Sequence, residues 1–204
     1  MRFLLAVLVL AAAGTVRGQG TSEAIRGFNT GITGSFAGTA GWTFQPAANI
    51  TVTELGCLAD FFVSNTYTSV QVGLWGPTGL LLASNSISLG STSHNQSLYA
   101  PVTGVTLASG STYHIGVYVP SATFSLYAVV PSQGGSVSNS TDIVSLKAAQ
   151  TASSGWGSPT EVAGVDPGSA YLGPNFQYTG GVPEPSAGAL LLLGAVLLGA
   201  RWKR

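Results

Sequence analysis

Short runs of alternating apolar and polar residues fill the middle of the chain, and each run ends near Gly, Pro, Ser or Asn. The clearest run is Thr112–Val119, in which every second residue from Tyr113 onward is Tyr, Ile or Val. A period of two indicates a half-buried β-strand, whereas an amphipathic helix needs a period of 3.6 residues. Because no convincing helical period crosses the middle, the pattern predicts an all-β body.

Eight or nine short strands follow from this pattern, and they predict a two-layer antiparallel β-sandwich that is jelly-roll-like in its number of strands. The predicted strands are Gly41–Phe44, Ile50–Leu58, Ser69–Trp75, Leu80–Leu89, Leu98–Leu107, Thr112–Val119, Phe124–Val130, Ile143–Leu146 and Ala170–Tyr178.

Local sequence features refine the prediction in four regions of the chain. The apolar parity of Ile50–Leu58 switches along the run, which predicts a bulge near Glu54 or Gly56. Gly76-Pro77-Thr78-Gly79 predicts a hairpin turn, because Pro77 presets its own φ and Gly79 can adopt a positive one. Pro101 and Gly104 interrupt Leu98–Leu107 and predict an edge strand or two short strands. The stretch 132–168 is expected to be loose apart from Ile143–Leu146.

The N-terminal end has the order of features of a secretory signal peptide. Arg2 precedes the apolar run Phe3–Ala13, which is too short to cross a bilayer, and small residues follow. Cleavage is expected after Ala13 or after Gly18, and residues 1–18 are therefore assigned to the signal peptide. The alternative is a buried N-terminal helix.

The C-terminal end is a three-part segment. Val182, Pro183, Glu184 and Pro185 come first, the apolar run Ala187–Ala200 follows, and a basic tail containing Arg201, Lys203 and Arg204 closes the chain. An apolar helix of this length covers about 21 Å, which is short of the ~30 Å hydrocarbon core. The basic tail would stay on the cytoplasmic side of an inner membrane.

These residues resemble the PEP-CTERM sorting signal of exopolysaccharide-producing Gram-negative bacteria. The resemblance covers residues 182–204 and implies recognition by exosortase, a membrane enzyme that acts near the Pro-Glu-Pro motif. It implies transient anchoring in the inner membrane and then sorting to the cell surface or the extracellular polysaccharide. The alternatives are an ordinary C-terminal anchor and a GPI signal, although a GPI signal rarely ends in a basic cluster.

Composition and charge describe the body between these ends, residues 19–181. Charged residues are only 7% of the chain, against about 25% in an average globular domain. Residues 19–181 contain two basic residues, Arg26 and Lys147, against six acidic ones, a net charge of −4. This balance excludes a basic stripe for nucleic acid, so no nucleic-acid partner is expected.

The body also resembles secreted bacterial domains of unknown function, over about residues 42–185, with a core expected at about 40–180. The resemblance implies a β-sandwich but points to no particular activity, because the function of these domains is unknown, and it places a shortened loop at Leu58–Thr68. It rests on several segments in the same order: Gly41–Phe44, Ile50–Gly56, Val72–Trp75, Gly79–Ser84, Pro101-Val102, Leu107–Tyr113 and Tyr171–Phe176.

The sequence lacks the motifs of common enzymes and cofactor sites. G-x-S-x-G, G-x-G-x-x-G, the P-loop and H-E-x-x-H do not occur. His94 is interpreted as a residue of a Ser-rich loop and His114 as one on the outer face of a strand. Glu54 and Asp60 are the best candidates for a carboxylate pair, and Glu54 is more simply an exposed charge. We expect no enzyme activity, no cofactor and no metal.

Cysteine and the aromatic residues leave a few other possibilities. Cys57, the single cysteine, is expected in the core, with intermolecular pairing as the alternative. Trp42 and Trp75 are expected to pack inside, whereas Trp156 lies in a Gly- and Ser-rich segment and is expected to be exposed. Flat aromatic rings stack on sugars, so Trp156 with Tyr118 and Tyr127, and with Tyr99 as a further member, is the candidate glycan contact.

Two functions are therefore compatible with the sequence. The first is a non-catalytic exported sandwich with a structural or adhesive role in the matrix. The alternative is a carbohydrate-binding module that recognises exopolysaccharide.

Overall fold

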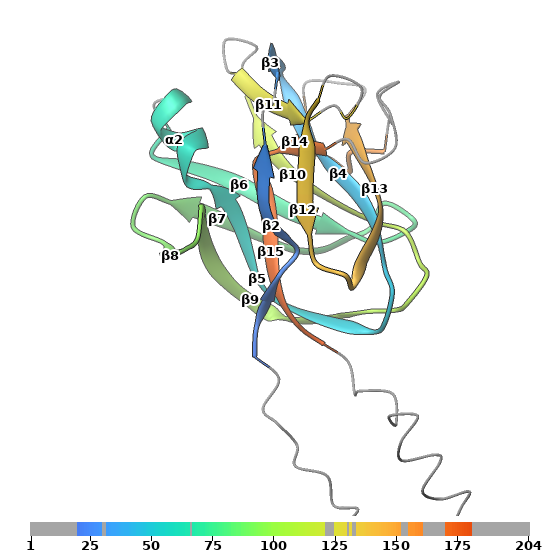
Figure 1. The fold of residues 1–204 in the computed structure, drawn as a ribbon. Helices are drawn as coiled ribbons and strands as arrows, with labels where there is room; N and C mark the ends of the chain where they lie inside the picture. Colours follow the sequence, from blue (N-terminus) through green and yellow to red (C-terminus); the bar gives the residue numbers. More distant parts are fainter. Residues whose placement is uncertain are drawn as a thin grey trace, which may run out of the picture.

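A computed structural model describes residues 20–29, 32–65, 67–120, 125–129, 131, 134–151, 155–160 and 170–180 (Figure 1). These residues form fifteen strands and one short helix. All recorded strand pairs are antiparallel. The prediction of an all-β body of packed antiparallel sheets is confirmed, but the expected number of strands was too low.

Two five-stranded sheets make up most of the body. The first sheet has the order β1 (Ser22–Glu23), β15 (Pro174–Gly180), β5 (Ile50–Leu58), β9 (Ser97–Leu107), β8 (Thr92–His94). The second sheet has the order β13 (Ile143–Gln150), β4 (Gly38–Pro46), β10 (Tyr113–Val119), β6 (Ser69–Trp75), β7 (Leu81–Ser88). Two smaller sheets have the orders β14 (Ala170–Leu172), β11 (Ser125–Val129), β3 (Ile32–Ser35) and β12 (Ser136–Asn139), β2 (Ile25–Asn29).

Aromatic side chains join the two large sheets across the core. The Phe176 ring of β15 lies 5.0 Å from that of Phe44 and 5.7 Å from that of Trp42, centroid to centroid, and both partners belong to β4. The Trp42 indole N–H donates to the Pro174 carbonyl at 3.0 Å, so the buried polar atom of this ring is satisfied. These contacts place the core between the inner faces of the two sheets.

Two local predictions for strands are confirmed. Pairing between β5 and β9 shifts between Val52 and Glu54, and this bulge returns Leu55 and Cys57 to the core side. The turn between β6 and β7 closes with Gly79 N–H donating to the Gly76 carbonyl at 3.0 Å, and Gly79 has a φ of +78°. Its lack of a side chain explains why Gly occupies this position.

Of four further predictions about elements, three were wrong and one was confirmed. The expected loop at Leu58–Thr68 contains α2 (Ala59–Asn65), because burying Phe61 and Phe62 completely favours a helical turn there. The prediction of an edge strand at Leu98–Leu107 is confirmed for most of its length, because β9 is continuous and β8 pairs only with its first three residues. The stretch 132–168 contains β12 and the eight-residue β13. The expected closing strand divides at Gly173 into β14 and β15, which belong to different sheets.

The first and last strands of the described body lie side by side. Ser22 pairs with Tyr178 and Glu23 with Gln177, which joins β1 to β15. The start of β1 and the end of β15 therefore lie at one pole, at the bottom of the view in Figure 1. Residues 1–18 and 182–204, the predicted signal peptide and sorting segment, lie outside the described residues. Within the described part of the chain, no helix combines the length and apolar character needed to cross a membrane.

Candidate functional site

The outer face of the second sheet brings together the residues with the best potential for binding. Strand pairing places Trp75, His114, Thr43 and Lys147 in one row across β6, β10, β4 and β13. The next row contains Gly73, Gly116 and Gly41. These three glycines, here called the glycine trough, remove side chains from the centre of the face.

A segment formed by residues 155–160, here called the crossing segment, lies on the glycine trough. A Cβ added at Gly73 would meet the Trp156 ring at 2.7 Å, and one added at Gly116 would meet Pro159 at 3.2 Å. The Thr39 hydroxyl holds the segment, since it contacts the Gly155 carbonyl oxygen at 3.3 Å and the Gly157 N–H at 3.2 Å. The close approach of this segment therefore accounts for glycine at Gly73 and Gly116, whereas a Cβ added at Gly41 would clash with the Ile115 carbonyl oxygen of β10.

Three aromatic rings meet beneath and beside the crossing segment. The Trp156 ring lies 4.9 Å from that of Trp75 and 6.1 Å from that of Tyr118, between centroids, and the Tyr118 contact is edge-on. Trp75 is buried, as expected, but on this outer face under Trp156 rather than between the sheets. Trp156 is only partly exposed, so the expectation of an exposed ring in a loop was wrong.

The structure brings together two of the three predicted glycan-contact residues. Trp156 and Tyr118 touch, as described above. Tyr127 belongs to β11, which lies in a different sheet, and its side chain is outside the described residues. Tyr99 is buried in the first sheet and hydrogen-bonds Glu23, so it does not extend the patch.

His114 lies on the outer face of its strand, as predicted, and is covered there by the crossing segment. Only 8% of this residue is exposed, and its Nδ1 atom has no hydrogen-bond partner. Burial lowers the pKa of His114 below its usual value of 6.5, and a hydrogen bond to the Pro159 backbone opposes that shift. The strand alternation placed His114 on the outer face correctly, but it could not show that a distant segment covers that face.

An open polar groove continues the same face toward β13. Its volume is about 590 Å³, within the range of ligand pockets. The lining residues are Thr43, Gln45, Thr112, Asn139, Ser145, Leu146 and Lys147. Six of these seven residues carry hydroxyl, amide or ammonium groups, which suits a ligand rich in hydroxyl groups.

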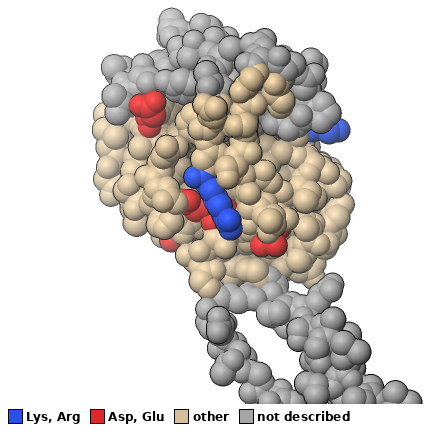
Figure 2. Space-filling model, viewed as in Figure 1, with Lys and Arg blue, Asp and Glu red and all other residues tan. Residues whose placement is uncertain are grey.

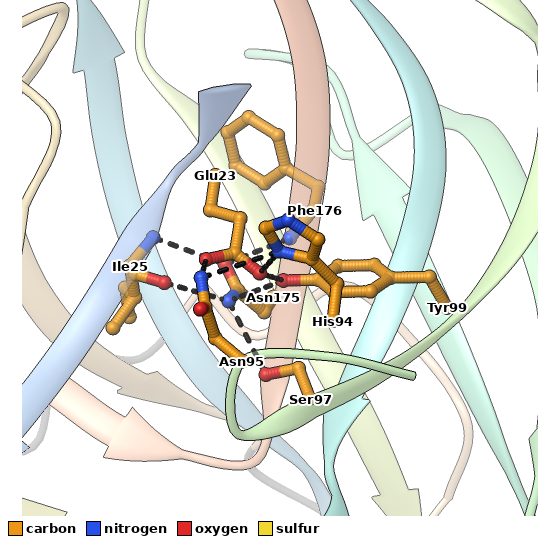
Figure 3. Close-up of polar contacts among 8 residues, drawn as sticks. All are labelled: Glu23, Ile25, His94, Asn95, Ser97, Tyr99, Asn175 and Phe176. Carbon is orange, nitrogen blue, oxygen red and sulfur yellow. Dashed lines mark hydrogen bonds and ion pairs between the residues drawn. The ribbon is translucent and has the colours of Figure 1, made fainter. Parts of the chain in front are cut away.

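A second polar cluster surrounds Glu23 in the first sheet (Figure 3). Its carboxylate is bonded to His94 Nδ1 at 2.8 Å, to the Tyr99 hydroxyl at 2.9 Å and to the Asn95 amide. The Asn175 amide donates to the Tyr99 hydroxyl at 2.8 Å and to the Ile25 carbonyl at 2.9 Å. Only 5% of the Glu23 side chain is exposed, and its carboxylate has three hydrogen-bond partners. These bonds connect β1 to the β8–β9 loop, which indicates a structural role for Glu23.

The sequence did not reveal this cluster, and His94 was interpreted as an ordinary loop residue. Glu23 and His94 stand far apart in the chain and no motif joins them, so only the fold shows the pair. Burial raises the pKa of the Tyr99 hydroxyl, and its hydrogen bond to Glu23 adds to the rise, so Tyr99 serves as a neutral donor. A shallow pocket beside the cluster is lined partly by Glu23, Arg26 and Asn95.

The remaining predicted residues are separate from both regions. Cys57 is fully buried and unpaired, as expected, and burial raises the pKa of its thiol. Asp60 is exposed on α2 while Glu54 is partly buried on β5, and no recorded hydrogen bond joins them. Among the described residues, no three His, Cys, Asp or Glu side chains gather as metal ligands. The sorting residues Val182, Pro183, Glu184, Pro185, Arg201, Lys203 and Arg204 lie outside the described residues.

Charge is sparse on the face in Figure 2, where most of the described surface is formed by uncharged residues. Among the described residues, the one recorded ion pair is that between His94 and Glu23. No family model, no curated protein and no solved structure matches this chain.

Proposed function

We propose that the protein is a non-catalytic exported component of the extracellular polysaccharide matrix, with a structural or adhesive role. In this proposal residues 1–18 direct export and residues 182–204 hold the chain transiently in the inner membrane, where exosortase sorts it to the surface or the matrix. The body between them is a jelly-roll-like sandwich that needs no cofactor.

The pairing of β1 with β15 is the observation that supports this proposal best. It places the beginning and end of the body at one pole, as Ser22 pairs with Tyr178. A C-terminal tether at that pole would leave the outer face of the second sheet and the far end of the body accessible to the matrix. The sparsely charged surface, with a net charge of −4 over residues 19–181, also suits an exported β-protein.

Intact mass tests the sorting step. The full chain is expressed in a host with exosortase and in one without it, and the intact mass of the surface or secreted form is measured by mass spectrometry. We expect loss of about residues 186–204 only in the host with exosortase. A tail retained in both hosts would contradict the proposal and leave an ordinary membrane anchor.

Carbohydrate binding is the second candidate function. The contact between Trp156 and Tyr118 on an outer sheet face favours it, because both rings are only partly buried and aromatic faces can stack on sugars. A glycan array compares the wild type with Trp156→Ala. Specific binding that the substitution removes would support this candidate, and no specific binding would contradict it.

A further inference from the structure

The groove beside β13 contains the one basic side chain on the outer face of the second sheet in the described part of the chain. Lys147 is exposed there and pairs across the strands with Thr43. The other basic residue of the body, Arg26, belongs to β2 in a separate sheet. Lys147 and Arg26 thus provide two equal charges on different surfaces of one molecule.

Lys147 has no carboxylate partner among the described residues. Two of the acids are engaged elsewhere: Glu23 by the cluster around His94, and Asp142 by the Tyr178 hydroxyl at 3.0 Å. An ammonium group that is not neutralised, in a body with excess acid, is available to an anion on a ligand.

Neighbouring amides in the groove are fixed in place. The Gln45 amide donates to the Thr112 hydroxyl at 3.1 Å. The Asn139 amide donates to the Ser140 carbonyl at 3.1 Å and to the Ile143 carbonyl at 2.5 Å. These bonds use one N–H group of Gln45 and both N–H groups of Asn139, so they orient both amides and leave the amide oxygens as positioned acceptors for hydroxyl donors.

The backbone of β13 is irregular at this groove. Pairing with β4 shifts between Val144 and Lys147, and Ser145 has a φ of +57°. A non-glycine residue in this conformation costs energy, and bulges of this kind occur next to binding sites, where they redirect a side chain. The bulge sets the register in which Lys147 lies opposite Thr43.

From these features we propose that the groove binds a sparsely acidic polysaccharide, with Lys147 holding a carboxylate and the fixed amides and hydroxyls holding sugar hydroxyl groups. The inference rests on the carbohydrate-binding candidate for its class of ligand, but it assigns the contact to other residues than the aromatic rings. A densely charged polyanion fits less well. The groove offers it a single ammonium group, and the body, with a net charge of −4, repels it.

An edge strand offers a competing explanation for Lys147. β13 is the outermost strand of its sheet, and lysines on edge strands discourage pairing with other chains. In that case the substitution of Lys147 would raise self-association and leave polysaccharide binding unchanged. The experiment below separates the two explanations.

Affinity electrophoresis of the full chain in non-ionic detergent measures binding in gels that contain gellan, polygalacturonate or dextran. Gellan carries its carboxylate on one sugar of each repeat, polygalacturonate on every sugar, and dextran on none. We expect the strongest retardation in gellan. Lys147→Gln should weaken gellan binding about tenfold, equivalent to about 1.4 kcal/mol, Lys147→Arg should retain most of it, and the matched control Arg26→Gln should change it less than twofold.

Several results would overturn the groove assignment. Equal gellan binding by the wild type and Lys147→Gln would overturn it. Equal losses of binding in Lys147→Gln and Arg26→Gln would also overturn it, because they would show that the net charge of the protein alone governs binding. A loss in Trp156→Ala with none in Lys147→Gln would overturn it while leaving the carbohydrate-binding candidate standing. No retardation in any polymer would overturn both, whereas the sorting proposal is judged separately by intact mass.

Discussion

The Trp156 indole packs against that of Trp75, with ring centroids 4.9 Å apart and ring planes inclined by 52°. Both rings lie within contact of the position that a side chain at Gly73 would occupy. The crossing segment therefore fits the outer face because Gly73 and Gly116, on neighbouring strands, leave room for Trp156 and Pro159. This packing joins a segment without strand structure to the second sheet.

Gly73→Ala should destabilise the protein by about 1–3 kcal/mol, because overpacking forces neighbouring groups to move. The new Cβ would lie 2.5 Å from the Trp75 ring. Urea unfolding gives the free energy, and near-ultraviolet circular dichroism reports on the indole pair. Gly27→Ala is the control, since no atom lies within 4 Å of a Cβ added there. A neutral effect of Gly73→Ala would contradict the close packing.

Stability should fall on acidification because of His114. Its pKa in the folded state is lowered from 6.5 by burial, so the unfolded chain binds the proton first as the pH falls. The contribution of the neutral imidazole is therefore present above about pH 6.5 and is lost as the pH falls from there toward the folded-state pKa. For one proton the slope is at most about 1.4 kcal/mol per pH unit.

Urea unfolding of the wild type and His114→Asn from pH 7.5 to pH 5 checks this dependence. The variant should lose the part of the slope that is due to His114. Identical slopes in the two proteins would show that His114 titrates equally in the folded and unfolded states.

Glu23→Ala should destabilise the protein by about 1–3 kcal/mol, because it leaves buried donors of Tyr99 and its neighbours unsatisfied. Amide exchange should speed up first in β1 and in the β8–β9 loop, which the carboxylate connects. Asp60→Asn, at an exposed position, is the matched control for loss of an acid. Exchange that rises uniformly across both sheets would argue against a local role for Glu23.

Cys57 should not react with a thiol reagent at pH 8 until the protein unfolds, because the thiol is fully buried and its pKa is raised. The labelling rate measured in increasing urea should follow the unfolding transition. Rapid labelling of the native protein, or a disulfide-linked dimer without reducing agent, would show that the thiol is accessible.

The sequence predicted best those elements whose signals are local. The bounds of β5 and β6 match the predicted ranges, and the turn at Gly76–Gly79 has the expected positive φ. In each case the alternation or turn chemistry is contained within a few consecutive residues.

Elements defined by distant partners were harder to predict. β13 was predicted only as far as Leu146, because Ala148 and Ala149 are weak strand signals, although both are buried where β13 pairs with β4. The partly buried state of Trp156 depends on its packing against Gly73 and Trp75 of β6, which lie far from it in the sequence. The ion pair between Glu23 and His94 has no local signal at all.

The distribution of the protein in a polysaccharide-producing, exosortase-containing host tests most directly the claim that it is exported and sorted to the matrix. Quantitative mass spectrometry of membrane, matrix and medium fractions compares the full chain with a variant that lacks residues 182–204. The account predicts the full chain in the matrix or at the surface without its tail, and the shortened variant released into the periplasm or medium. The same distribution of both proteins would contradict it.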